Sequence, residues 1–169
     1  MCVMDLYRKF GISKAVQYLD GVFAFILYDT TTNETYVARD MFGIRPLFYY
    51  EKEEYIVFGS ELKMIHDIER LSKLQQFQPG YIMNVSKEGK CREYYPHSLA
   101  LSVIPKYNIT EHMAAYIVKT SLENAVKKRV LNTQRNVTCL LSGGLDSSLV
   151  TALVSKIIYP KRLNTWCVG

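Results

Sequence analysis

The chain has 169 residues, of which 49% are hydrophobic and 22% charged. This balance excludes an intrinsically disordered chain and leaves room for one globular domain or two small ones. The net charge of +5 comes from basic residues along the chain, whose one compact run is Lys127-Lys128-Arg129. That run falls at the end of an expected helix, where cations complement the helix dipole, so we expect no nucleic-acid partner.

The cysteines and the apolar segments exclude two further classes. Four cysteines, at positions 2, 91, 139 and 167, lack the spacing of a metal site. The sequence shows no signal peptide and no apolar run near the ~20 residues that span a bilayer. We therefore expect a cytoplasmic protein with reduced cysteines and no membrane contact.

The first hundred residues are expected to form mainly antiparallel sheet with short helices. Residues 4–19 predict two short helical pieces that are broken at Gly11. Residues 22–28 form an unbroken apolar run that predicts a strand buried on both faces. Turn residues follow it, and 34–38 alternates as a partner strand, so the two predict a hairpin.

A loop across residues 38–50 carries three charged side chains, Arg39, Asp40 and Arg45. Because catalysis would need a neighbouring nucleophile or base and none is found, we expect these charges to form internal pairs that fix the loop. The other elements expected in this part are an aromatic strand after the loop, strands at 55–59, 81–85 and 91–95, the last two as a hairpin, and a helix at 61–66 capped by Ser60.

A linker and a long helix are expected next. Residues 100–108 lack periodicity and carry Pro105, which suits a linker. Thr110 is expected to cap a helix that runs to about Val130 and packs by one apolar face on the sheet that follows. The apolar positions of that face are Ala114, Val118, Leu122, Ala125 and Val126.

The next segment predicts a strand, a glycine turn and a helix. Residues 137–141 predict a strand covered on both faces, and Gly143 and Gly144 remove Cβ atoms where the backbone turns sharply. Residues 147–158 then predict a crossover helix and 163–168 the next strand. Together they predict a right-handed βαβ unit.

Such a turn places backbone N–H groups before the positive end of a helix and so predicts an anion site. Ser142, Ser147 and Ser148 add hydroxyl donors, whereas Asp146 suits a magnesium ion that bridges it to phosphate oxygens. We therefore expect a nucleotide with its metal rather than a simple oxyanion. The loop lacks the spacing and the lysine of a Walker A motif. An ordinary strand-to-helix turn is the alternative.

The SGGLDS run at Ser142–Ser147 resembles the SGGxDS loop of the ATP pyrophosphatases, which cleave ATP between its α and β phosphates. The flanking residues 124–129 and 139–141 resemble glutamine-hydrolysing asparagine synthetases in particular. The resemblance implies that magnesium lies at Asp146 and that the backbones of Leu141 and Val168 touch adenine. It also implies that the pyrophosphate is held by Ser142, Gly143, Gly144, Asp146 and Ser147.

The first part of the chain resembles the later portion of class II glutamine amidotransferase domains. The likeness is carried by GVFAF at 21–25, ARD at 38–40, FGIRPL at 42–47, GSE at 59–61 and PGY at 79–81. Those domains are N-terminal-nucleophile folds of αββα type, with two antiparallel sheets between helices. The resemblance thus implies two domains: a partial α+β glutaminase domain at 1–104, and at 105–169 an α/β region that begins an ATP pyrophosphatase domain with its first βαβ unit.

This domain order implies an asparagine synthetase, a carbon–nitrogen ligase of amino-acid biosynthesis. By resemblance, glutamine would yield ammonia at the first domain, ATP would adenylate aspartate at the second, and ammonia would displace AMP to give asparagine. The implied small molecules are ATP, magnesium, aspartate and glutamine, and a homodimer stays open.

The chain is expected to be incomplete at both ends relative to this family. The family's glutaminase nucleophile is an N-terminal cysteine that lies far upstream of the GVFAF strand, whereas Cys2 lies shortly before Gly21 and is followed by Val3 in place of glycine. We expect Cys2 to be an ordinary helical cysteine, and we assign no catalytic residue. The chain is expected to complete neither half reaction; glutaminase activity of the purified protein would contradict this.

Two other interpretations stay open. The chain can be a non-catalytic remnant that at most binds nucleotide or a partner, or it can belong to another ATP pyrophosphatase, such as a β-lactam synthetase or a tRNA-thiolating enzyme. The neighbouring coding sequence, or substrate-dependent ATP–pyrophosphate exchange by a completed protein, would separate them.

Overall fold

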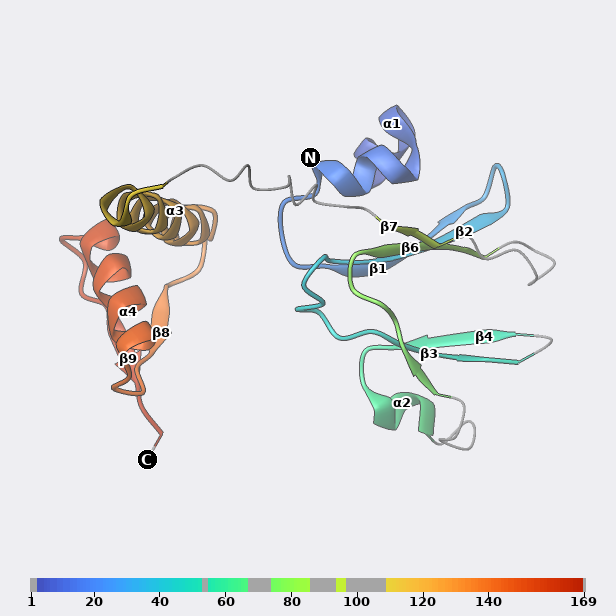
Figure 1. The fold of residues 1–169 in the computed structure, drawn as a ribbon. Helices are drawn as coiled ribbons and strands as arrows, with labels where there is room; N and C mark the ends of the chain where they lie inside the picture. Colours follow the sequence, from blue (N-terminus) through green and yellow to red (C-terminus); the bar gives the residue numbers. More distant parts are fainter. Residues whose placement is uncertain (1–2, 53–54, 67–73, 86–93, 97–108, 169) are drawn as a thin grey trace. The chain divides into compact units, whose positions relative to one another are not determined.

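The computed structural model describes residues 3–52, 55–66, 74–85, 94–96 and 109–168 (Figure 1). The chain divides into two compact units, Met1–Pro105 and Lys106–Gly169, each of which is described by itself. The linker expected at 100–108 lies outside the described residues.

Two antiparallel sheets form the first unit, which is of the α+β class. The larger sheet has the strand order β1-β2-β6-β7 and the smaller one the order β4-β3-β5. The hairpins expected from the sequence, β1 with β2 and β6 with β7, are both present. The strands are β1 (Ala24–Asp29), β2 (Glu34–Arg39), β3 (Phe48–Glu51), β4 (Ile56–Gly59), β5 (Gln75–Gln76), β6 (Tyr81–Val85) and β7 (Tyr94–Pro96).

Within this unit the two sheets are stacked, with helix α1 (Val3–Tyr18) outside the larger sheet and helix α2 (Leu62–His66) outside the smaller one (Figure 1). Alternation along the strands separates two cores, because successive side chains of a strand point to opposite faces. Val37 and Met83 face the core between the sheets, and Ala38 and Ile82 face α1. The inner core contains Val37, Leu47, Tyr49, Phe77 and Met83.

Helix α1 covers the larger sheet through Val16, which packs with the outward side chains of β2 and β6. The helix is interrupted at Gly11, whose φ of 74° and ψ of 169° are not helical. This confirms the predicted break into two helical pieces. On the other side of the unit, Ile65 of α2 is buried and lies against Gly59.

The prediction that the first strand is buried on both faces is wrong. Ile26 and Tyr28 are 52% and 56% exposed. Strand β1 is at one edge of its sheet. Ala24 still packs against the inner core, so the core is covered where β1 begins and open toward its end.

The second unit contains a parallel pair of strands, β8 (Thr138–Leu140) and β9 (Asn164–Trp166), separated in sequence by helix α4 (Leu145–Ile158). Helix α3 (Glu111–Leu131) precedes them. Thr110 caps α3, because its hydroxyl oxygen accepts a hydrogen bond from the Met113 N–H at 3.3 Å. The predicted cap is therefore confirmed.

Two packing predictions for this unit are wrong. Helix α3 packs mainly on α4 rather than on the sheet, and of its expected apolar face only Val126 is fully buried, while Val118 is 66% exposed. Strand β8 is not covered on both faces, since Leu140 is 78% exposed. Two strands and two helices bury one side of each element, and nothing else in the described part of the chain covers the rest.

Candidate functional site

The SGGLDS loop begins where strand β8 ends. The Leu141 N–H donates to the Trp166 carbonyl at 2.8 Å and so extends the parallel pairing of β8 with β9 by one residue. Leu141 and Val168 therefore both follow the carboxyl ends of neighbouring parallel strands, which is where open α/β sheets bind ligands. Val168 is 95% exposed.

One of the two glycines in the loop is required by the backbone. Gly143 has a φ of +83°, a left-handed conformation that side chains disfavour, and open space where a Cβ would lie. Gly144 has an ordinary φ of −73° and is the N-cap residue of α4. The expectation that both glycines serve the turn thus holds for Gly143 alone, and Gly144 instead leaves the helix end without a capping side chain.

Helix α4 presents donors toward the loop. Its first intrahelical hydrogen bond runs from the Ser148 N–H to the Gly144 carbonyl at 3.1 Å. The N–H groups of Leu145, Asp146 and Ser147 come before that bond, and Gly144 has no side-chain cap to satisfy them. Unpaired N–H groups at the positive end of a helix attract an anion.

The structure brings together two of the three predicted hydroxyl groups. The Ser142 and Ser147 hydroxyl oxygens lie 3.0 Å apart, and the Ser147 hydroxyl donates to the Gly144 carbonyl at 3.1 Å. The Ser142 hydroxyl then donates to Ser147 and can turn to an anion at the cost of that one bond. Ser148 contributes its backbone N–H to the helix.

Asp146 lies exposed in the first turn of α4, two residues after the N-cap. The helix begins at Leu145, two residues earlier than expected, so this carboxylate sits at the positive helix end, which stabilises it. A single carboxylate fits magnesium when phosphate oxygens and water supply the other ligands. No cluster of three or more histidine, cysteine or acidic side chains suited to a metal occurs among the described residues.

In the first unit, the buried carboxylate of Asp40 organises the loop that leads into β3. Oδ1 accepts the N–H groups of Phe42 at 3.1 Å and Ile44 at 3.0 Å, and Oδ2 those of Phe23 at 3.3 Å and Arg45 at 3.0 Å. Burial raises the pKa of Asp40, but these four hydrogen bonds outweigh it and hold the pKa below its usual value.

The neighbouring Arg39, only 2% exposed, donates to three carbonyl oxygens from the other side of the same loop. Its acceptors are Arg45 and Gly43, each at 2.7 Å, and Phe77 at 2.5 Å. Arg39 and Asp40 fix the loop, as predicted, but the contacts that do so are hydrogen bonds to backbone groups and not the predicted internal pairs, and Arg45 contributes its N–H and carbonyl. The loop exposes Phe42 and Ile44 (76% and 61%), and Met41 lies beside Gly80.

A polar cluster between α1 and the β1–β2 hairpin was not expected from the sequence. The Tyr7 hydroxyl donates to Asp29 at 2.7 Å, and this hydrogen bond lowers the pKa of Asp29. The Tyr36 hydroxyl donates to Glu34 in the same way and lowers the pKa of Glu34. Scattered single tyrosines and carboxylates carry no motif, so only the fold could bring them together.

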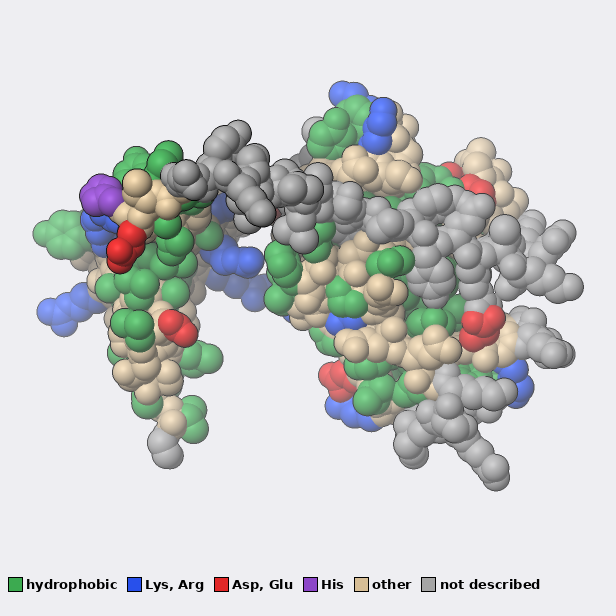
Figure 2. All heavy atoms as spheres, viewed as in Figure 1, with side chains coloured by type: hydrophobic (Ala, Val, Ile, Leu, Met, Phe, Trp, Pro, Cys, Tyr) green, Lys and Arg blue, Asp and Glu red, His purple; other side chains and the backbone are tan. Residues whose placement is uncertain are grey.

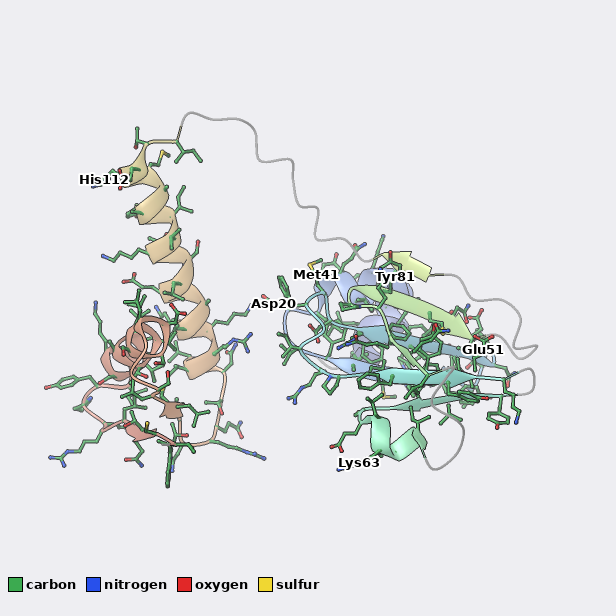
Figure 3. The ribbon with its side chains drawn as sticks, turned by 60° about the horizontal axis from the view of Figure 1, so that its bottom comes forward. Asp20, Met41, Glu51, Lys63, Tyr81 and His112 are labelled. Atoms are coloured by element: carbon green, nitrogen blue, oxygen red, sulfur yellow. The ribbon has the colours of Figure 1, made fainter. Side chains whose placement is uncertain are left out.

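Some of the cysteines and histidines lie outside the described part of the chain. Cys2, Cys91 and His97 are not among the described residues, so the expectation that Cys2 is a helical cysteine is not tested. Cys139 and Cys167 are free thiols. His112 lies at the start of α3 (Figure 3), remote in sequence from both cysteines. Within the described residues, no helix is both long enough and apolar enough to span a bilayer.

Comparison with known proteins gives two family matches. Residues 1–67 match the family described as glutamine amidotransferase domain, and residues 118–169 match the family described as asparagine synthase. Curated relatives are glutamine-hydrolysing asparagine synthetases: that of Pongo abelii is 36% identical, that of Homo sapiens 35% and that of Gallus gallus 33%, each over 99% of this chain. The chain spans about a third (34%) of the length of these relatives.

Two solved structures also align with the chain. One is a glutamine phosphoribosylpyrophosphate amidotransferase from B. subtilis, at 18% identity and a TM-score of 0.46, covering 98% of this chain and 38% of the other. The second is an allosteric regulatory enzyme of purine biosynthesis, at 20% identity and a TM-score of 0.48, covering 98% and 37%. Likeness at this level does not assign a fold.

Proposed function

We propose, because this chain belongs to the family of glutamine-hydrolysing asparagine synthetases, that it is part of an ATP-dependent ligase that makes asparagine from aspartate with glutamine as the nitrogen donor. Residues 1–104 would form part of the glutaminase domain, of N-terminal-nucleophile type, and residues 105–169 the beginning of an ATP pyrophosphatase domain. The β8–α4–β9 unit would be the first βαβ unit of that domain.

The observation that carries the proposal is the uncapped start of α4 behind Gly143. The loop combines three N–H groups without a capping side chain, a left-handed glycine with open space beside it, and the Ser142–Ser147 hydroxyl pair. This donor set suits the two linked phosphates that leave when ATP is cleaved between its α and β phosphates, because fixed N–H dipoles stabilise developing negative charge.

The other residues of the site take roles that follow from their places. Asp146 would hold magnesium, which would screen the phosphate charge from the carboxylate. Leu141 and Val168, at the ends of the two parallel strands, would contact adenine through their backbones, and Gly144 would let the phosphates approach the helix end closely. Glutamine and aspartate are proposed substrates of the family's two half reactions.

A titration of the 169-residue protein with ATP, with and without magnesium, tests the nucleotide site. We expect the unmodified protein to bind ATP saturably and only with magnesium. Gly143→Val should lose this binding, because its side chain would fill the phosphate position. In Asp146→Ala, binding should no longer depend on magnesium. Gly21→Val, which places a side chain in open space in the first unit, is the matched control. Equal, negligible binding by all four proteins would refute the proposed site.

The comparisons favour one carboxylic acid as the substrate that ATP would adenylate. The curated relatives named above are asparagine synthetases, so aspartate is proposed over the acceptors of β-lactam synthetases or tRNA-thiolating enzymes. In a protein completed at both ends, ATP–pyrophosphate exchange stimulated by aspartate, and not by other carboxylic acids, is the expected result. If aspartate left the exchange rate unchanged and another acid raised it, the result would favour membership of another ATP pyrophosphatase family.

A further inference from the structure

The second unit carries positive charge that the proposed function does not use. Nine of the chain's lysines and arginines, but only three of its acidic residues, fall between positions 106 and 169. Blue basic side chains accordingly project from this unit in Figure 2, with few red acidic ones. The charge of the whole chain is thus concentrated here, contrary to the even spread assumed from the sequence.

Three of these cations line a hollow of about 540 Å³. Val137, just before β8, and Asn164, the first residue of β9, also line it. The SGGLDS loop follows the other ends of the same strands, so the hollow lies at the opposite edge of the sheet. Its basic lining residues are Arg135, Lys161 and Arg162.

A second hollow, of about 420 Å³, lies between α3 and α4 and adds Lys127 and Lys156. Leu131 and Ile157 line both hollows. The two hollows therefore adjoin, and we call them together the cationic groove. Its basic lining residues, which we call the rim, are Lys127, Arg135, Lys156, Lys161 and Arg162.

Helix ends offset only part of this charge. Helices α3 and α4 both end at the groove, at Leu131 and Ile158, and each carbonyl end is equivalent to about −0.5 charge. Glu123 is the one acidic lining residue. In the described part of the chain, none of the five cations forms an ion pair within 4.0 Å. Five positive charges against about two negative ones leave the groove clearly cationic.

The floor of the groove includes apolar side chains. Val130, Leu131, Val137, Ile157 and Ile158 make up nearly half of the lining of the larger hollow. A bare phosphate gains nothing from such a floor, whereas an apolar side chain that packs on it is removed from water.

Two backbone donors in the groove are already used. The Arg135 N–H donates to the Thr133 hydroxyl at 3.2 Å, and the Lys161 N–H donates to the Ile158 carbonyl at 3.0 Å. These two N–H groups are therefore not available to a nest that would recognise a single phosphate. Recognition rests on long side chains spread along an extended rim, and that suits several acidic groups on one flexible ligand.

We propose that the cationic groove binds an acidic peptide segment of a partner protein, with its apolar side chains on the floor and its carboxylates at the rim. The occupant is chosen by complementarity of charge to the rim and of apolar surface to the floor. The cationic groove lies at the edge of the sheet opposite to the SGGLDS loop, and peptide binding there does not depend on the proposed nucleotide site.

Fluorescence anisotropy with defined peptides tests the choice of ligand on the full 169-residue chain. A labelled peptide of alternating glutamate and leucine is expected to bind, and to bind more weakly as salt screens the charges. A glutamate–serine peptide of equal charge should bind at least about tenfold more weakly, because it lacks the apolar anchors. Equal binding of the two peptides, displacement by inorganic phosphate at matched charge, or preference for a single-stranded oligonucleotide would each overturn the proposal.

Two double variants of equal charge change test the location. Arg135→Glu with Arg162→Glu should weaken binding by about tenfold or more, since two attractive contacts become repulsive. Lys14→Glu with Lys119→Glu, at exposed positions outside the groove, should change it less than about twofold. An equal loss in both variants would mean unspecific charge attraction and overturn the proposal.

Amide chemical shifts of the unmodified protein provide a check that needs no variant. On titration with the glutamate–leucine peptide, the amide signals of Val137, Ile157 and Lys161 should move. Movement confined to residues 142–147 would place the peptide on the SGGLDS loop instead and contradict the assignment of the groove.

Discussion

Replacing Asp40 with asparagine should destabilise the first unit strongly. The carboxylate accepts four backbone N–H groups, two on each oxygen, and the residue is only 2% exposed. Asparagine keeps one oxygen and presents an NH₂ group where the other was, so two partly buried N–H donors lose their acceptor and face another donor. At about 1–2 kcal/mol for each unsatisfied buried donor, the expected loss is about 3 kcal/mol.

Urea unfolding, followed by the amide signals of Val37, Ile82 and Met83 in NMR spectra, measures this loss in the core of the first unit. Trp166 is the chain's one tryptophan, so its fluorescence follows the second unit in the same samples. Glu61→Gln is the matched control: it removes an exposed carboxylate whose 2.6 Å ion pair with Lys63 is solvated and should cost less than about 1 kcal/mol. A loss for Asp40→Asn no larger than for this control would refute the reasoning.

The same carboxylate predicts a pH dependence. Because the pKa of Asp40 is lower in the folded protein than in the unfolded chain, its contribution is present above the unfolded value of about 3.9 and is lost as pH falls through the folded value. The stability difference between the wild type and Asp40→Asn should therefore be constant near neutral pH and shrink in acid. A difference that grows as pH falls below about 4 would contradict this sign.

Two further substitutions test the backbone. Gly43→Ala should lower the free energy of unfolding in urea by at least about 2 kcal/mol, because φ is +62° and the new Cβ would lie 2.7 Å from Pro79 Cγ. The control Gly21→Ala places its Cβ in open space and should change the stability little. Equal effects of the two substitutions would exclude strain as the cause. Thr110→Ala removes the cap of α3 and should lower its stability by about 1 kcal/mol, as measured by thermal unfolding with circular dichroism. The control Thr120→Ala removes a hydroxyl that donates back to the Tyr116 carbonyl and should be neutral or slightly stabilising. A larger loss of stability for Thr120→Ala than for Thr110→Ala would argue against capping.

Local patterns in the sequence determined most of the elements. Alternating apolar residues and turn residues predicted the hairpins of the first unit, and the glycine with a helix-compatible apolar run predicted the turn between β8 and α4. The helix break at Gly11 and the helix cap at Thr110 were predicted correctly, because a break or a cap depends on the residue itself and on its immediate neighbours. The SGGLDS motif likewise pointed to a nucleotide loop, whose ligand stays a proposal.

Tertiary structure alone decided which surfaces are buried. The apolar runs of β1 and β8 are the same whether a strand lies in the middle of a sheet or at its edge, so Ile26 and Leu140 could be judged only once their neighbours were known. Asp40 was predicted to pair with charges, yet it binds backbone N–H groups, because a loop folded around a carboxylate offers donors that no sequence pattern displays. The cationic groove arises in the same way: Arg135 and Arg162 follow different helices, and only the parallel pairing of β8 with β9 brings both turns to one edge of the sheet.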